Sequence, residues 1–222
     1  ITKNPISLHM IFKGPPGTGK TTIARLLGQI YKEIGCLKKG HVVEVDRSKL
    51  VGQFIGQTAK QTMKYLEKAL DGILFIDEAY SLNSGGDKDF GSESIDTILK
   101  FMEDNRDRIV VIAVGYDEKM NEFVQSNPGL LSRFNKTINF EPYTKEELYS
   151  IFKLFAKEGG MIVNTNLKKP LLQFIKKLIK RSNKASFGNA REIRNLYESM
   201  LLEQSNRLNI HNININDINI FK

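Results

Sequence analysis

The sequence predicts a three-layer α/β domain built on a five-stranded parallel sheet, followed by a small all-helical subdomain. Three observations support this fold class. Short apolar segments alternate with segments of helical periodicity, a glycine-rich loop joins the first strand to the first helix, and strand patterns stop near Tyr143. Parallel strands need long crossover connections, which alternating helices supply. Residues 1–142 are therefore expected to form the α/β core.

Five short segments rich in β-branched and aromatic residues are expected to form the sheet. They are Leu8–Lys13, Val42–Asp46, Ile73–Asp77, Ile109–Val114 and Thr137–Phe140. Most carry too few polar residues for a strand with one face in solvent, so we expect five buried strands.

Helical periodicity fills the intervals between these segments. Spacing of i, i+3, i+4 and i+7 predicts a helix that stops at Gly35, from Ile23, Leu26, Leu27, Ile30 and Ile34. The stretch Thr58-Ala59-Lys60-Gln61 has the form of a capping box and predicts the start of a second helix. A third helix is marked by Ile95, Ile98, Leu99 and Met102.

The rest of the chain changes character. Residues 143–208 contain three or four helical stretches and no strand pattern, so we expect a helical subdomain there. The tail, residues 209–222, alternates Asn with Ile and is compatible with a strand, a loop or a frayed end. Because Ile1 lies only a few residues before the first strand, we expect that a preceding segment has been cut off.

The composition is that of a globular protein from a reducing compartment. The 222 residues are 41% hydrophobic, enough for a full core. Cys36 is the single cysteine, so neither an internal disulfide nor a structural zinc site is expected. The apolar runs are far shorter than a membrane span, and no signal-peptide pattern opens the chain. We therefore expect a cytoplasmic protein that does not enter membranes.

The charge balance is basic, with 33 Lys and Arg against 25 Asp and Glu, a formal net charge of +8. This invites a nucleic-acid interpretation. Much of the excess, however, lies between Lys168 and Arg181, where cations interleave with Leu171, Ile175 and Ile179. That pattern is typical of an amphipathic helix with a solvated face, so we expect no nucleic-acid partner from it.

A glycine-rich loop after the first strand carries the strongest chemical signal. Residues 14–21 match the pattern G-x-x-x-x-G-K-[ST], between a predicted strand and a predicted helix. Glycines allow successive N–H groups to point at one anion, at the positive end of the helix dipole. Lys20 would reach the outer phosphates and Thr21 would hold Mg²⁺. The predicted nucleotide-binding residues are Gly14, Pro15, Pro16, Gly17, Thr18, Gly19, Lys20, Thr21, Thr22 and Asp77.

Two carboxylates end the third predicted strand. Because Asp77 and Glu78 follow Ile73–Ile76, they are expected at the same sheet edge as the glycine-rich loop. Asp77 would complete the Mg²⁺ site, and Glu78 would activate a water for attack on the γ-phosphate of the nucleotide. A GTPase is disfavoured, because Asn135-Lys136 is not followed by the x-Asp that reads guanine.

With these motifs the chain resembles the AAA+ ATPases, most closely the branch that contains stage V sporulation protein K and the red-type Rubisco activase CbbX. The resemblance extends from Leu8 to about Leu208. It rests on Leu8-His9-Met10, residues 50–59 (LVGQFIGQTA), residues 77–82 (DEAYSL), residues 127–134 (NPGLLSRF) and residues 188–195 (GNAREIRN). It implies a ring, usually a hexamer of identical subunits, with ATP at the subunit boundaries, a helical lid and an axial pore that acts on a protein.

Further residues acquire roles only through this resemblance. Arg133 corresponds to the arginine finger that acts on the neighbouring subunit's site. Arg191 resembles sensor 2, with Arg194 as a competing candidate. The triplet Phe54-Ile55-Gly56 resembles a pore loop, although a core position for Phe54 is the alternative. The family's polar sensor 1 residue is absent, because the fourth strand ends in Val114-Gly115-Tyr116, which leaves the Tyr116 hydroxyl or another group in its place.

Three functions remain open at this stage. The first is a ring ATPase that remodels a protein partner, supported by the pore-loop triplet. The second is a nucleic-acid machine of the clamp-loader or helicase-loader type, supported only by the net charge. The third is a nucleotide-gated scaffold with little turnover, which a measurement of ATP hydrolysis would separate from the other two.

Overall fold

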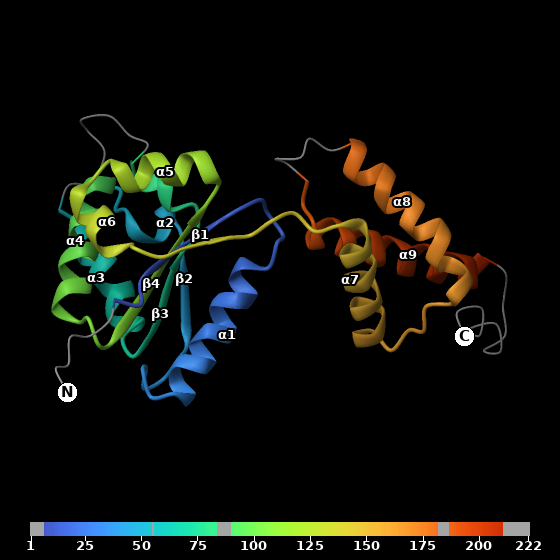
Figure 1. The fold of residues 1–222 in the computed structure, drawn as a ribbon, viewed down its shortest axis with the longest axis horizontal. Helices are drawn as coiled ribbons and strands as arrows, with labels where there is room; N and C mark the ends of the chain where they lie inside the picture. Colours follow the sequence, from blue (N-terminus) through green and yellow to red (C-terminus); the bar gives the residue numbers. More distant parts are fainter. Residues whose placement is uncertain (1–6, 55, 84–89, 182–186, 211–222) are drawn as a thin grey trace. The chain divides into compact units, whose positions relative to one another are not determined.

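The structure is a computed structural model that describes residues 7–54, 56–83, 90–181 and 187–210. It forms two compact units. The α/β unit contains the chain up to Gly14 together with Gly19–Phe140, and the helical unit contains Pro15–Thr18 together with the chain from Glu141 onward. The tip of the glycine-rich loop thus packs with the second unit, and both units are drawn in Figure 1.

The α/β unit is built on the predicted five-stranded sheet, and all its pairings are parallel. The order across the sheet is β2-β3-β4-β1-β5. The strands are β1 (Met10–Lys13), β2 (Val42–Val45), β3 (Gly72–Ile76), β4 (Ile109–Gly115) and β5 (Thr137–Asn139). Every end of these strands lies within two residues of the predicted end, so the predicted strands are confirmed.

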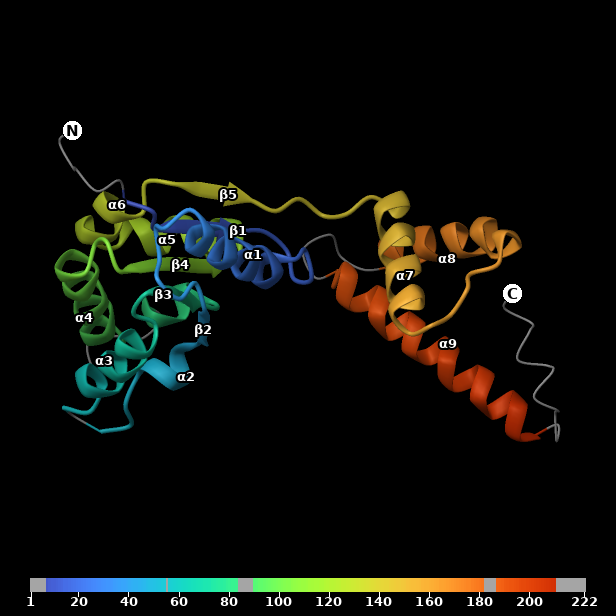
Figure 2. The same ribbon diagram turned by 90° about the horizontal axis from the view of Figure 1, so that it is seen from below.

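Helices cover both faces of this sheet, which confirms the three-layer class. They are α1 (Lys20–Glu33), α2 (Arg47–Leu50), α3 (Thr58–Lys68), the 3₁₀ turn η1 (Ala79–Asn83), α4 (Gly91–Asp104), α5 (Asp117–Gln125) and α6 (Pro128–Arg133). Figures 1 and 2 show α3 and α4 side by side on one flank, apart from α1. The side chains of β4 alternate accordingly: Val110, Ile112 and Val114 pack on the α1 side, and the residues between them pack with α3 and α4.

Two strands are less buried than predicted. All three residues of β5 are exposed, and in β2 only Val45 is fully buried. Both lie at the edges of the sheet, so each has one strand neighbour instead of two. The expectation of five buried strands was therefore wrong for β5, whereas β3 and β4 are buried throughout.

Helix α1 forms where predicted, and Gly35 follows its end in the left-handed conformation, with φ of 77°. Its fully buried residues are the small Ala24 and Gly28, and the partly buried Leu27 and Tyr31 pack beside them. A Cβ at Gly28 would lie 2.2 Å from the Gly40 carbonyl oxygen, so the helix approaches this turn at backbone distance. The exposed apolar stripe of α1 consists of Ile23, Leu26, Ile30 and Ile34.

Helix α3 starts differently from the prediction. Its N-cap is Gln57, whose side chain makes no capping bond, and Thr58 is the first helical residue. The Thr58 hydroxyl instead accepts a hydrogen bond from the Gly52 N–H at 3.0 Å, in a fully buried position. The predicted capping box is therefore wrong, because the preceding loop uses the threonine oxygen.

The helical unit contains α7 (Lys145–Glu158), the 3₁₀ turn η2 (Thr165–Leu167), α8 (Lys168–Arg181) and α9 (Ala190–Ile210). Helix α7 begins with a capping box in which Thr144 and Glu147 bond each other's backbone N–H groups. The Glu147 carboxylate accepts hydrogen bonds from the Thr144 N–H and hydroxyl, and these two bonds lower its pKa. A separate apolar core joins the helices, around Leu148, Phe152 and Ile175. The tail, residues 211–222, lies outside the described residues.

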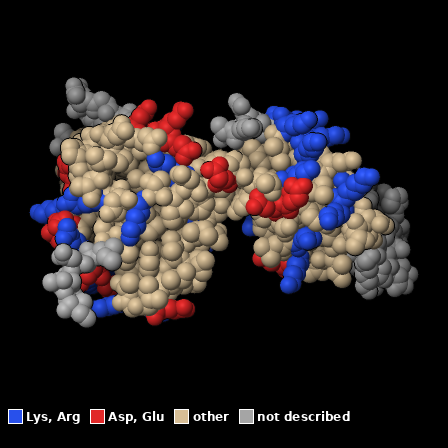
Figure 3. All heavy atoms as spheres, viewed as in Figure 1, with Lys and Arg blue, Asp and Glu red and all other residues tan. Residues whose placement is uncertain are grey.

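The cations of α8 lie on its outer face, as predicted. Leu171 and Ile175 are buried, while six Lys and Arg residues and no acid occupy the remaining surface of the helix. Figure 3 shows these side chains in blue. Within the described part of the chain, no helix has the length and apolar content that crossing a membrane requires.

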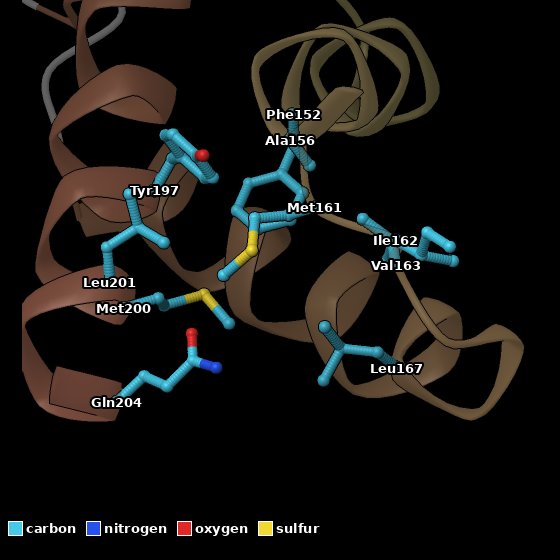
Figure 4. A pocket seen from close by; sticks show the side chains of 10 residues that line it. All are labelled: Phe152, Ala156, Met161, Ile162, Val163, Leu167, Tyr197, Met200, Leu201 and Gln204. Atoms are coloured by element: carbon cyan, nitrogen blue, oxygen red, sulfur yellow. The ribbon is translucent and has the colours of Figure 1, made fainter. Parts of the chain in front are cut away.

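A small apolar pocket lies within the helical unit (Figure 4). It has a volume of about 30 Å³ and is lined by side chains of α7, α9 and the segment between α7 and α8, among them Phe152, Met161, Tyr197 and Met200. This volume corresponds to about one water molecule. The pocket is therefore a gap in packing and too small for a nucleotide.

His9 is one of the buried polar residues of the α/β unit. His9 is 3% exposed, and its Nδ1 accepts a hydrogen bond from the Val111 N–H at 3.0 Å. Burial lowers the pKa of His9 to about 4, and the positive charges of Arg133, Arg106 and Lys136 add to this effect. The imidazole is neutral at pH 7, with its proton on Nε2.

We expect His9 to make the protein less stable in mild acid. An unfolded chain binds a proton on this side chain near pH 6.5, whereas the folded chain does not until about pH 4, so stability falls as the pH drops through that interval. Between pH 7 and pH 4.5 this amounts to about 2 kcal/mol. Denaturant unfolding at both pH values measures it. A His9→Gln variant, which can still accept from Val111, should lose about this part of the pH dependence, and an unchanged dependence would contradict the assignment.

Candidate active site

The glycine-rich loop between β1 and α1 has the backbone of an anion-binding loop. Gly14 and Gly17 have φ of 142° and 69°, and Gly19 is the left-handed N-cap of α1. A Cβ at Gly14 would lie 2.2 Å from the Phe140 carbonyl oxygen, and one at Gly17 would lie 2.0 Å from that of Gly188. Only glycine fits these positions. The first turn of α1 therefore follows the loop directly, and its N–H groups lie where a phosphate group would bind.

Lys20 lies against this loop. Its Nζ donates a hydrogen bond to the Gly14 carbonyl oxygen at 2.8 Å, so the ammonium group is held beside the predicted phosphate position. The Thr18 hydroxyl donates to the Pro15 carbonyl oxygen at 2.9 Å and stiffens the turn. Thr21 is half-buried in the first turn of α1, and Thr22 beside it is exposed.

The two acidic residues follow β3 at the same edge of the sheet. Ile76 pairs with Ala113, and Lys13 pairs with Gly115, so β3 and β1 end next to the end of β4. Asp77 and Glu78 are both exposed there, and the Asp77 Oδ1 accepts the Glu78 N–H at 3.1 Å. The carboxylate of Asp77 and the hydroxyl of Thr21 are oxygen donors of the kind that Mg²⁺ prefers.

Glu78 has a strained backbone. Its φ is 47°, and among the described residues only Asp71 and Asn189 share a positive φ without being glycine. Such a conformation is costly for a side chain of this size and is found where the surrounding structure imposes it, often at active sites. The strain falls on the residue that the sequence predicts as the activator of water.

Tyr80 is a part of this site that the sequence reasoning did not assign a role. Burial raises its pKa to about 12, as do the charge of Glu78 and a hydrogen bond between the two side chains. Its ring lies 6.2 Å from that of Tyr116, measured between centroids, and the Lys119 ammonium lies 4.8 Å from its centre. The structure thus brings Tyr116, the predicted substitute for sensor 1, next to a tyrosine that contacts Glu78. In the sequence, the position of Tyr80 two residues after Glu78 is the feature that could have indicated this contact.

Arg133 ends α6 and turns toward α4. Its guanidinium lies 3.2 Å from the Glu103 carboxylate, and a weaker contact of 3.4 Å reaches the Gly129 carbonyl oxygen. The side chain is 27% exposed, and its buried Nε has no acceptor among the described residues. In this conformation Arg133 pairs within its own chain, and a role toward a neighbour would require release from Glu103.

The two candidates for sensor 2 differ in their surroundings. Arg191 is exposed at the start of α9, where its backbone N–H donates to the Gly188 carbonyl oxygen. Arg194 lies over the ring of Phe155, at 4.6 Å from its centre. Arg194 thus has a cation–π partner within its own unit, and the assignment of Arg191 as sensor 2 stays a prediction.

Phe54 is 66% exposed in the loop between α2 and α3. Its carbonyl oxygen accepts the Gln57 N–H at 3.2 Å, and Gly56 has φ of 78° with open space around it. Ile55 lies outside the described residues. The alternative of a core phenylalanine does not agree with this exposure.

The loop, the acidic strand end and the parallel sheet define a nucleoside triphosphatase of the phosphate-loop class. Comparison with known proteins refines this. The model of the "ATPase family associated with various cellular activities (AAA)" matches residues 10–142, and that of the "AAA lid domain" matches residues 144–220. The chain belongs to the AAA family of ATPases, and it is an ATP hydrolase.

Curated relatives support this family. Stage V sporulation protein K of Bacillus subtilis (strain 168) is 44% identical over 202 residues, which cover 91% of this chain and 63% of that protein. The chloroplastic ribulose bisphosphate carboxylase/oxygenase activase of Cyanidioschyzon merolae is 44% identical over 208 residues, which cover 93% of this chain and 70% of the relative. The chain thus spans less than two thirds of the first of these relatives.

A solved structure supports the fold alone. The crystal structure of the FIGL-1 AAA domain in complex with ADP aligns with a TM-score of 0.63 at 18% identity, over 97% of this chain and 68% of that chain.

We expect Lys20→Ala and Glu78→Gln to separate binding from hydrolysis. Loss of the ammonium group should weaken ATP binding by at least about 100-fold, whereas the amide should leave binding intact and lower turnover by at least about 100-fold. Binding of a fluorescent ATP analogue and phosphate release measure the two effects. Lys32→Ala, an exposed lysine in the last turn of the same helix, is the control and should behave as the parent. Equal loss of binding in both test variants would refute the division of roles.

Proposed function

We propose that the chain forms a ring of identical subunits, usually six, that uses ATP hydrolysis to pull on a protein partner through a central pore. The observation that carries the proposal is the exposure of Phe54 in a loop, where an apolar side chain gains nothing from folding. Aromatic side chains suit this task because they offer a large contact area with few rotamers to order. The relative named as an activase of a carboxylase supports a protein as the partner.

Within each subunit the residues divide the chemistry of hydrolysis. The backbone N–H groups of residues 14–21 would hold the phosphates, with Thr22 beside them, and Lys20 would neutralise the outer phosphate charge. Thr21 and Asp77 would hold Mg²⁺, which supplies charge neutralisation and orients the phosphate oxygens. Glu78 would accept a proton from the attacking water, held in place by Tyr80.

Two arginines would complete the site. Arg191 would contact the γ-phosphate at the start of α9, and Arg133 would act on the neighbouring subunit after leaving Glu103. A nucleic-acid partner is the alternative, and the six cations of α8 are the structural feature that supports it. Steep salt dependence of DNA or RNA binding by the parent would favour that alternative.

Replacement of Phe54 by alanine tests the pore loop. Because the side chain is mostly exposed, Phe54→Ala should change the free energy of unfolding by less than about 0.5 kcal/mol. It should nevertheless abolish the stimulation of ATP hydrolysis by an unfolded polypeptide such as casein. Phe174→Ala, at a 45% exposed phenylalanine on α8, is the control and should be stimulated like the parent. A large loss of stability in Phe54→Ala, or normal stimulation, would overturn the pore-loop assignment.

Mixing of subunits tests Arg133. Rings of Arg133→Ala alone and of Lys20→Ala alone should both lose ATP hydrolysis, the first for lack of the finger and the second for lack of nucleotide. Mixtures should regain activity, because some boundaries then combine an intact loop with an intact arginine. Arg106→Ala removes the other arginine that pairs with Glu103 and should hydrolyse ATP as the parent does. Absence of recovery in rings shown to exchange subunits would argue against action across a boundary.

A further inference from the structure

Three consecutive carbonyl oxygens of the glycine-rich loop accept hydrogen bonds inside the helical unit. The Asn189 Nδ2 donates to Pro16, the Ala190 N–H donates to Gly17, and the Tyr143 hydroxyl donates to Thr18, each at 3.1 Å. All these residues belong to the same compact unit. The donors come from the linker before α7 and from the start of α9, far apart in the sequence.

These bonds determine which way the loop's N–H groups point. In a planar trans peptide the C=O group and the following N–H group point in opposite directions, and the chain has no cis peptide among its described residues. Bonds to the carbonyls of Pro16, Gly17 and Thr18 therefore turn the N–H groups of Gly17, Thr18 and Gly19 to the other side. Those N–H groups are the ones predicted to surround phosphate.

Asn189 is the centre of this arrangement. It is fully buried, and it adopts the left-handed conformation with φ of 46°. Its Oδ1 accepts the Tyr143 N–H at 3.0 Å, and its Nδ2 donates to the Phe187 carbonyl oxygen at 2.9 Å as well as to Pro16. Asparagine has two amide donors and one acceptor oxygen, and all three functions are used. Aspartate could replace the acceptor but not the donors.

The packing leaves the loop no room to turn. A Cβ at Gly17 would lie 2.0 Å from the Gly188 carbonyl oxygen and 3.1 Å from the Arg191 N atom, so two backbone segments are in direct contact. The Gly17 carbonyl oxygen accepts the Ala190 N–H, and the Gly17 Cα lies against the Gly188 backbone, so this peptide cannot rotate freely.

We propose that Asn189 is a positioning residue for nucleotide binding: with Tyr143 it holds three peptide planes of the phosphate loop in the orientation that presents N–H groups to ATP. The loop and the first turn of α9 are then linked, so that nucleotide bound to the loop stabilises the start of that helix by the same factor as the helix favours binding. The proposal rests on the assignment of residues 14–21 as the phosphate loop.

The main test is Asn189→Gly, because glycine keeps the left-handed backbone at no cost and removes only the side chain. We expect affinity for N-methylanthraniloyl-ADP with Mg²⁺ to fall by about 10-fold to 100-fold. KM for ATP should rise more than kcat falls, since the interaction is made with the bound ground state. In the parent, nucleotide should slow amide hydrogen exchange at the start of α9, and this protection should be lost in the variant.

A second variant guards against failure of the first to fold. Tyr143→Phe removes only the hydroxyl that bonds Thr18, and we expect a loss of affinity of about 3-fold to 10-fold. Tyr197→Phe is its matched control in the same unit, because the Tyr197 hydroxyl is buried with no hydrogen-bond partner among the described residues, so affinity should be unchanged.

Parental affinity and parental exchange protection in both Asn189→Gly and Tyr143→Phe would overturn the proposal. If Lys20→Ala loses binding while these variants do not, the phosphate loop is correctly assigned and only the positioning role fails. If Lys20→Ala itself binds nucleotide as the parent does, the loop assignment and the inference fail together.

Discussion

The parallel pairing of β1 with β4 and of β4 with β3 is the constraint on which the active site depends. Because these strands run in one direction, Lys13, Ile76 and Gly115 reach the same edge of the sheet, and the phosphate loop, the acidic pair and Tyr116 follow them. Burial maintains this register: a slip of one residue in β4 would exchange the side chains that pack on α1 with those that pack on α3 and α4. The chemistry thus relies on apolar packing at some distance from it.

Several residues of the candidate site have a positive φ. Left-handed residues occur in the phosphate loop, at Glu78 and at Asn189, which are separated in sequence but all assigned to nucleotide handling. Glycine accepts such conformations freely and asparagine tolerates them, whereas glutamate does so at a cost. Glu78 has a hydrogen bond from its N–H to the Asp77 carboxylate and another between its side chain and that of Tyr80.

Much of the fold could be predicted from the sequence because strong local patterns govern it. The apolar runs of β3 and β4 are long and fully buried, and the pattern at residues 14–21 lies between a strand and a helix, as a phosphate loop requires. Burial was harder to predict, since it depends on neighbours that no local pattern contains. Exposure of β5 follows from its place at the sheet edge, and the packed face of α1 follows from the small size of Ala24 and Gly28. The role of Asn189 was hidden for the same reason, because its partner Pro16 lies 173 positions away.

Helix α1 begins at the phosphate loop, and its exposed apolar stripe runs from there to the far end of the helix. Lys20 begins the helix, and Ile34 follows its last residue, about 20 Å away at 1.5 Å per residue. Helices of this length usually curve only gently, and α1 contains no proline that would kink it. A partner that covered the exposed side chains of Ile30 and Ile34 would therefore contact the same continuous helix that carries Lys20 and Thr21 at its other end.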